Sequence, residues 1–275
     1  MSRRFTFLLT LCLVSGADAE SFDRHDGPQL MRAVYDRHEQ YPYVYEEQSM
    51  IMIDQQGNKN TRKLRRYSRV NQDGTADFLL LFDSPLEIKG VALLARRDPS
   101  GHARQSFYLP AFGAQFLPAQ TSHQSRHDDN FLGTDYSIEN LVGDQLDKVR
   151  HIRRDDVIID ETAYYVVDVH DIELPETGPV RRHYIRMDTL FITRTDHFDE
   201  LGRLHKRQTN HDLVNVHGQS WRANMLMMEN HQQRHRTVIK IDRRVFSADY
   251  VPEDVFSQAW ILANQRPLED DGVSL

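Results

Sequence analysis

Cysteine is almost absent from this sequence of 275 residues, and the position of the single one removes it as a functional group. Cys12 lies in an apolar run at residues 5–14, which follows two arginines and precedes a small-residue sequence that closes at Ala19. This order is typical of a cleaved secretory signal, because about ten apolar residues are too few to span a bilayer. We expect residues 1–19 to be the signal, so that residues 20–275 contain no thiol, disulfide or cysteine-ligated metal.

Cys12 has one alternative interpretation, as the acylated cysteine of a lipoprotein. The residue before it is Leu11, at the position where a lipoprotein signal carries a small residue. We therefore favour the cleaved signal, which predicts export to the periplasm. A mature chain without disulfides has to fold through burial of its apolar surface.

A basic excess, a second long apolar run and the common catalytic motifs are also missing. Lys and Arg number 34 against 41 Asp and Glu, and the resulting net charge of -7 disfavours nucleic-acid binding, which needs a strongly basic face. No run of 18 apolar residues follows the signal, so we expect a soluble mature protein, and a monomer. Without a Gly-x-Ser-x-Gly elbow or a glycine-rich phosphate loop, the residues point neither to an enzyme nor to a cofactor.

Histidine, by contrast, occurs 14 times, so a metal site has to be considered. His231 and His235 have the spacing of two zinc ligands on a helix, but no glutamate lies between them and we expect a hairpin loop there. His123 and His127 form a second group, in a polar loop. His205, His211 and His217 recur every six residues, and we expect them at scattered surface positions. We predict no metal site, and a secreted hydrolase or metal enzyme is the least favoured alternative.

The apolar pattern predicts one amphipathic helix followed by a long series of strands. Asp26 and Pro28 are typical of a helix start, and helical spacing continues to about residue 40. Beyond Pro42 the apolar residues alternate between tight turns, which is typical of antiparallel strands. Examples are residues 78–82, 91–95, 106–109, 163–169, 182–187, 190–195, 220–228 and 237–245.

Two short helical stretches, at residues 137–141 and 253–260, interrupt the strands. Neither a linker nor a repeat divides the chain. We therefore predict that residues 20–275 form a single domain of mainly β structure with flanking helices, in which an antiparallel sheet curls into a barrel.

Alternation gives each strand one apolar and one polar face. Trp221, Met225 and Met227 share the apolar face of their strand, opposite Arg222 and Asn224. Because burial of apolar area contributes about 25 cal/mol per Å², we expect the apolar faces to point inward. The predicted interior, lipid-binding surface consists of Phe107, Leu109, Tyr165, Val167, Ile185, Trp221, Met225 and Met227. The pattern is compatible with a filled core and with a ligand cavity, although flexible methionines suit a cavity wall.

Three motifs follow one another in the middle of the chain. The first, PLEIKGVALL, contains Pro85, Lys89 and Gly90, and the second, FYLPA, contains Tyr108 and Pro110. The third, NFLGTDYSIENL, contains Phe131, Gly133, Asp135, Tyr136 and Leu141. In this order the motifs resemble the periplasmic outer-membrane lipoprotein-sorting family, the LolA-like proteins often associated with RND-type exporters.

The resemblance implies an incomplete, strongly curved antiparallel β-barrel with a helical lid over an apolar cavity. The third motif would pack beside the lid at the cavity mouth, with Gly133 needed for its tight backbone. Two features depart from the family: Phe107 replaces its usual tryptophan, and residues 113–118 replace a segment that is usually basic.

The function that the resemblance implies is transport of a lipid, or of a lipidated protein held by its acyl chains, between the envelope membranes. An RND-type exporter in the inner membrane is the partner expected from the same likeness. The alternative is a non-carrier accessory subunit of an envelope complex, which senses lipid or docks to an exporter.

Overall fold

The structure is a computed structural model that describes residues 22–38, 41–98, 103–110, 116–118, 130–142, 149–173 and 178–264. The predicted signal at residues 1–19 lies outside this part of the chain, as do His123 and His127.

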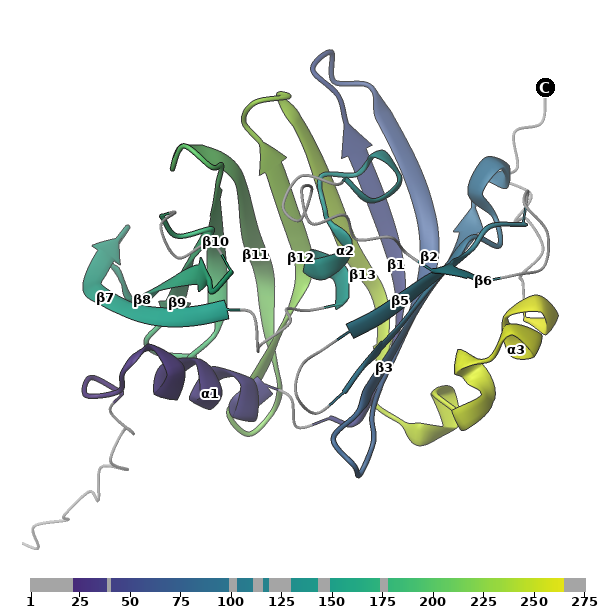
Figure 1. Cartoon of the computed structure of the whole chain (residues 1–275), viewed down its shortest axis with the longest axis horizontal. Coiled ribbons are helices and arrows are strands. Elements are labelled where there is room, and N and C mark those ends of the chain that lie inside the picture. Colours follow the sequence, from purple (N-terminus) through teal and green to yellow (C-terminus); the bar gives the residue numbers. More distant parts are fainter. Residues whose placement is uncertain are drawn as a thin grey trace, which may run out of the picture.

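In the described part of the chain, one antiparallel sheet of thirteen strands dominates the fold (Figure 1). The strands are β1 (Tyr43–Ile53), β2 (Lys59–Val70), β3 (Ala76–Ser84), β4 (Ala92–Arg97), β5 (Ala103–Tyr108), β6 (Phe116–Pro118), β7 (Val149–Ile159), β8 (Thr162–Asp171), β9 (Arg181–Arg186), β10 (Ile192–Phe198), β11 (Leu204–His217), β12 (Ser220–Asn230) and β13 (His235–Val245).

The strand order is β6-β5-β4-β3-β2-β1-β13-β12-β11-β10-β9-β8-β7. Each strand therefore pairs with its neighbours in sequence, except that β6 does not pair with β7 and that β1 also pairs with β13, which joins the two halves. The described sheet is curled, and because its edge strands β6 and β7 do not pair with each other, it forms an open barrel. This mainly β architecture, an open and curved antiparallel sheet with flanking helices, confirms the predicted fold class.

The helix α1 (Gly27–His38) begins with a reciprocal pair of hydrogen bonds. The backbone N–H of Gln29 donates to Asp26 Oδ1 over 2.8 Å, and the backbone N–H of Asp26 donates to Gln29 Oε1 over 3.1 Å. This capping box satisfies N–H groups that a helix start leaves unpaired. One side of α1 packs on β8 and β9, where a buried cluster contains Leu30, Met31, Val34, Tyr165, Val167 and Ile185. The helix thus covers one end of the concave face (Figure 1).

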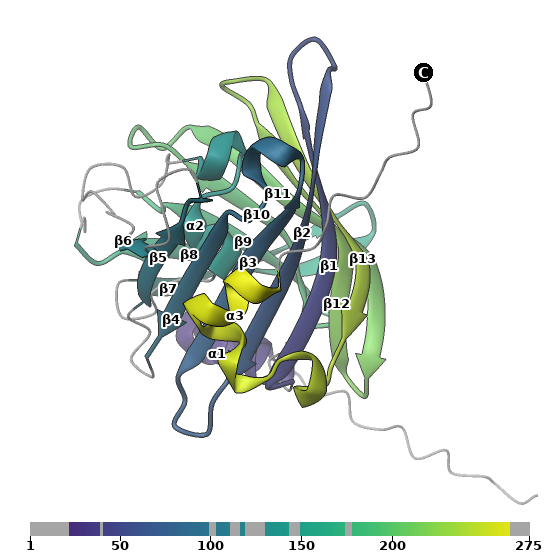
Figure 2. The same cartoon turned by 90° about the vertical axis from the view of Figure 1, so that its right-hand side faces the viewer.

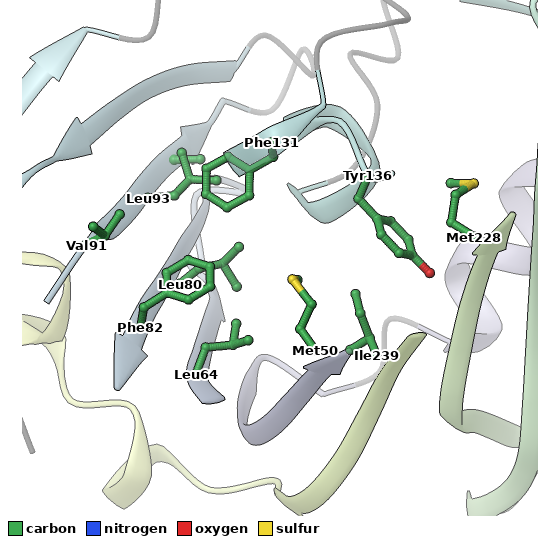
Figure 3. Close-up of a cluster of buried hydrophobic side chains, with 11 residues drawn as sticks. Met50, Leu64, Leu80, Phe82, Val91, Leu93, Phe131, Tyr136, Met228 and Ile239 are labelled. Atoms are coloured by element: carbon green, nitrogen blue, oxygen red, sulfur yellow. The ribbon is translucent and has the colours of Figure 1, made fainter. Parts of the chain in front are cut away.

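A second buried cluster fills the concave side from β1 to β4 together with β12 and β13 (Figure 3). Met50 on β1 lies directly opposite Ile239 on β13, and both belong to this cluster. Phe131 and Tyr136, from the loop before α2 (Ile138–Val142), pack over the strands. The third sequence motif therefore completes the concave core.

The convex face of the same strands carries a third cluster, which the C-terminal segment covers (Figure 2). Tyr45, Tyr67 and Leu79 point to this side and pack against the segment formed by η5 (Ala248–Tyr250), η6 (Glu253–Phe256) and α3 (Gln258–Ala263). β1 to β3 are consequently apolar on both faces, which is why their buried residues do not alternate cleanly.

The predicted elements differ from the structure mainly at their ends. β10 begins at Ile192 and not at Leu190, because Leu190 has a φ of 53° in the preceding turn. α1 ends at His38, and residues 39–40 lie outside the described part. The predicted helix at 253–260 is a 3-10 turn followed by α3.

The histidines match the predictions in part. His231 lies in the turn between β12 and β13, and His235 begins β13, as expected for a hairpin. His217 is exposed, but His205 is buried, with 7% of its surface exposed. The predicted surface position is wrong for His205, which lies at the start of β11, whereas His211 is half-buried and His217 is exposed at its end.

Candidate functional site

A cavity of about 1060 Å³ lies between α1, α2 and the concave face of the sheet. Its walls come from distant strands: Arg66 on β2 and Phe78 on β3 line one side, and His183 on β9 and Gln208 on β11 line another. Small-molecule sites commonly have volumes of about 300–1,000 Å³. The cavity therefore has room for a ligand with a long chain.

Apolar side chains from four different elements form much of the lining. They include Met31, Val34, Phe78, Leu141, Phe191 and Ile192. Met31 and Val34 come from α1, so the same helix that closes the cluster on β8 and β9 also forms a cavity wall. Contact with these side chains would remove a hydrocarbon chain from water.

The charged part of the lining is strongly cationic. Among the described residues it contains one carboxylate, on Asp36, and six guanidinium groups, on Arg32, Arg66, Arg97, Arg150, Arg181 and Arg222. The whole chain has a net charge of -7. The sheet therefore concentrates positive charge on its concave side in an acidic protein.

One of these arginines, Arg66, belongs to a network across β2, β1, β13 and β12. Glu46 lies opposite Arg66 on one side and Arg244 on the other. Its carboxylate is 2.6 Å from Arg244 Nε and 3.5 Å from Arg66 Nη1. Although burial opposes the shift, the charges of Arg66 and Arg244 lower the pKa of Glu46. Glu46 thus remains ionised and is shared between two cations.

His38 fixes the end of α1 at the cavity wall. Its Nδ1 accepts a hydrogen bond from the backbone N–H of Trp221 over 3.2 Å, so Nε2 carries the proton and donates to the carbonyl of Leu190 over 3.0 Å. Burial lowers the pKa of His38 to about 4, and the Leu190 bond opposes this while the charges of Arg222 and Arg37 add to it. A neutral imidazole therefore joins α1 to β12 at neutral pH.

The third sequence motif is attached to β13 through Asp135. Its carboxylate Oδ2 accepts hydrogen bonds from the Thr237 hydroxyl over 2.7 Å and from His235 Nδ1 over 2.8 Å. Gly133 has a φ of 76°, in the left-handed region that favours glycine. Phe131 stacks on Phe107 with the ring centroids 5.7 Å apart. The motif thus has structural contacts that hold it against the concave core.

Leu141 is the one residue of the predicted site that lines the cavity within the described part of the chain. Phe107 and Leu109 pack against the cluster below the motif loop. Tyr165, Val167 and Ile185 are buried beneath α1, with exposures of 4%, 0% and 0%. Phe107 and Leu109 are half-buried, and none of these five side chains forms part of the cavity wall.

Trp221, Met225 and Met227 do not share that face. Leu226 and Met228 belong to the concave cluster, and alternate residues of a strand point to opposite sides. The prediction that the three odd-numbered residues face inward is therefore wrong. Both faces of β12 carry apolar side chains, so its sequence did not distinguish them.

The other motif residues have positions in turns or in the convex core. Pro85, Lys89 and Gly90 lie in the turn between β3 and β4, which contains the 3-10 helix η1 (Leu86–Ile88). Gly90 has a φ of 79° and its N–H donates to the carbonyl of Phe82 over 2.8 Å. Tyr108 is buried on the convex side, and Pro110 is exposed.

The sequence pattern does not reveal the polar cavity residues, for a physical reason. Arg222 alternates with apolar residues, which predicts a solvent-facing side chain, yet it lines the cavity. Arg66 lies on β2 among several other basic residues, and no local pattern distinguishes it. A polar residue on an inward face becomes recognisable once the curvature of the sheet is known.

Within the described part of the chain, no helix is long and apolar enough to cross a membrane. No group of three or more histidine, aspartate or glutamate side chains there is arranged to hold a metal ion.

Comparison with solved structures places this architecture among known folds. A domain from Vibrio parahaemolyticus assigned to outer-membrane lipoprotein sorting superposes with a TM-score of 0.75 at 20% identity, covering 86% of this chain and 97% of that one. A DUF1329 family protein from Desulfovibrio piger gives 0.69 at 21% identity, covering 82% and 96%. A LolA superfamily protein from Nitrosomonas europaea gives 0.66 at 12% identity, covering 86% and 99%.

These likenesses and the open, curved sheet define the protein as one with a LolA-like fold. A family model described as an uncharacterized protein matches residues 74–262, and the chain belongs to this family. A comparison with curated proteins gave no match. The fold that the resemblance of the three sequence motifs implies is thus confirmed.

Proposed function

We propose that this protein is a periplasmic carrier that binds a lipid, or the acyl chains of a lipoprotein, in the cavity between α1 and the concave face. The observation that carries the proposal is the partly apolar cavity of about 1060 Å³, which opens within a LolA-like sheet. One structural relative is assigned to lipoprotein sorting, which supports the same class of ligand.

The energetics favour a cavity that is only partly apolar. Each buried CH₂ of an acyl chain contributes about 0.8 kcal/mol, so full enclosure of 16 carbons approaches roughly 12 kcal/mol. That corresponds to nearly nanomolar binding and to slow release. Polar lining residues such as Gln208 and Asn210 reduce the apolar contact, which suits a carrier that has to unload.

Residues 1–19 are a cleaved signal, residues 20–275 are one monomeric domain, and the protein shuttles its ligand without catalysis or a cofactor. An RND-type exporter in the inner membrane is the proposed partner. N-terminal sequencing of protein from the periplasm should start near Glu20, and an acylated Cys12 would contradict the signal assignment.

The ligand can be tested directly. Native mass spectrometry of the full protein isolated from the periplasm, followed by lipid extraction, should reveal a bound acyl-chain compound. Ile192→Trp would fill part of the cavity, since Ile192 lines it. We expect this variant to remain folded by circular dichroism and to take up a fluorescent fatty acid about tenfold less tightly.

Ile158→Trp is the matched control, because Ile158 is 77% exposed on the edge strand β7. It should bind the fatty acid like the unchanged protein. Absence of copurified lipid together with no uptake by any form would contradict the carrier function. A stable exporter complex with an empty cavity would instead favour the accessory-subunit alternative.

A further inference from the structure

We propose that the cavity selects amphiphiles that carry one anionic headgroup, a carboxylate or a phosphate, and that Arg66 and Arg222 bind this group. The proposal rests on the lipid-carrier function and adds the headgroup chemistry of the ligand. It depends on the charges of the cavity wall and on their position beside its apolar part.

The first observation is an imbalance of charge in a partly buried network. Glu46 is shared by Arg66 and Arg244, whose side chains are 24% and 10% exposed. Arg244 is the closer partner, at 2.6 Å, and it also donates to Asn224 Oδ1 over 3.0 Å and to the carbonyl of Ala223 over 2.8 Å. The longer 3.5 Å contact leaves Arg66 with capacity to bind a second anion.

The second observation concerns Arg222, which also lines the cavity. Among the described residues its hydrogen bonds go to neutral oxygens, namely the carbonyls of His38 and Trp221 and the hydroxyl of Ser220. Burial lowers the pKa of Arg222, and the charge of Arg244 adds to this effect. The Arg222 side chain is half-buried, the charge of Glu46 opposes the lowering of its pKa, and none of the described ion pairs involves it, so a bound anion would stabilise this cation.

The third observation is that these cations adjoin the hydrocarbon part of the cavity. The guanidinium carbon of Arg66 lies 5.8 Å from the centre of the Phe78 ring, and that of Arg97 lies 5.6 Å from the same ring. Phe78, Leu141 and Ile192 line the cavity together with Arg66. One ligand with a charged end and an alkyl chain therefore meets both kinds of surface.

Guanidinium groups match this chemistry because their planar donors bind carboxylate and phosphate oxygens in pairs. A neutral headgroup such as an alcohol would leave Arg66 and Arg222 without a charged acceptor. The selectivity follows from residues of this chain that the three sequence motifs do not contain.

Isothermal titration of the delipidated mature protein with decanoate, decyl phosphate, decanol and inorganic phosphate tests the proposal. We expect the two anionic amphiphiles to bind at least about tenfold more tightly than decanol, because hydrogen bonds to charged groups are strong. If decanoate binds more tightly than decyl phosphate, the headgroup is that of a fatty acid, and if decyl phosphate binds more tightly, it is a lipid phosphate. Inorganic phosphate should bind weakly, since it has no chain.

Arg66→Gln should weaken both anionic amphiphiles about tenfold and leave decanol unchanged, while Arg66→Lys should retain part of the affinity. Arg222→Gln should have the same effect, but it also removes bonds to backbone carbonyls, so Arg66→Gln is the decisive variant. Arg104→Gln is the matched control, because Arg104 is exposed on β5. It should bind all probes like the unchanged protein.

Equal affinity for decanol and decanoate, with no effect of Arg66→Gln, would overturn the anionic selectivity and leave the carrier function standing. Inorganic phosphate that binds as tightly as decyl phosphate would overturn it too, because the chain would then contribute nothing. Failure of every amphiphile to bind would instead contradict the carrier function itself.

Discussion

The hydroxyl of Thr237 on β13 bonds twice to Asp135 in the loop before α2. It donates to the Asp135 carboxylate over 2.7 Å and accepts from the Asp135 backbone N–H over 3.0 Å. Both residues are fully buried. This contact joins segments about a hundred positions apart in sequence and fixes the motif loop over the concave core.

Replacing Thr237 with valine should destabilise the protein by about 2–3 kcal/mol, because the buried Asp135 groups would lose their hydroxyl partner. Urea denaturation monitored by circular dichroism measures the free energy of unfolding. Thr61→Val is the control, since Thr61 is exposed on β2 and should change stability little. Equal effects of the two substitutions would contradict the anchoring role.

His38 should make stability depend on pH below neutrality. Its pKa is lowered from 6.5 to about 4 by burial, so between these values the unfolded chain binds a proton that the folded chain does not. The contribution of neutral His38 to the free energy of unfolding should therefore be complete above pH 6.5. It should decrease by about 3 kcal/mol as the pH drops to 4.

The contribution of His38 can be isolated by comparing the unchanged protein with His38→Gln. Denaturation at a series of pH values between 4 and 7 should show a shallower loss of stability in the variant. An identical slope in both proteins would mean that His38 is not held in its neutral form.

The orientation of β12 leads to opposite expectations for two neighbouring methionines. Met228 is fully buried in the concave cluster, so Met228→Asp should cost about 3–5 kcal/mol or prevent folding, since the charge would have no partner. Met225 lies half-buried on the other face, and Met225→Asp should cost about 1 kcal/mol. Greater destabilisation by Met225→Asp would restore the orientation predicted from the sequence.

Gly133 has a φ of 76° in the motif loop. A Cβ at this position would meet no atom within 4 Å, so Gly133→Ala should act through backbone strain alone. We expect a loss of about 1 kcal/mol in thermal or chemical denaturation. Gly178→Ala is the control, because its added Cβ also meets no atom and its φ is not in the left-handed region.

Much of the fold could be predicted from the sequence because it depends on local chemistry. The capping residues Asp26 and Gln29, the alternating runs and the turn residues each favour one backbone conformation. Those local preferences gave α1, most strand positions and the antiparallel arrangement. The order of the three motifs indicated a LolA-like architecture.

The candidate site could be predicted far less well, because alternation defines two faces of a strand without stating which one is inside. The sheet curves so that Arg222 and Met228 lie on the concave side, while the C-terminal segment covers the apolar convex side around Tyr67. A side chain's environment then depends on contacts between segments far apart in sequence.

The sequence by itself thus determined the strands, the turns and the class of fold, since these follow from residue type and spacing. The tertiary structure alone decided that the face of β12 that carries Arg222 points into a cavity and that Arg66 and Arg222 both line it. The physical reason is that curvature and coverage are collective properties of the whole sheet, and charge imbalance arises only when distant strands are brought together.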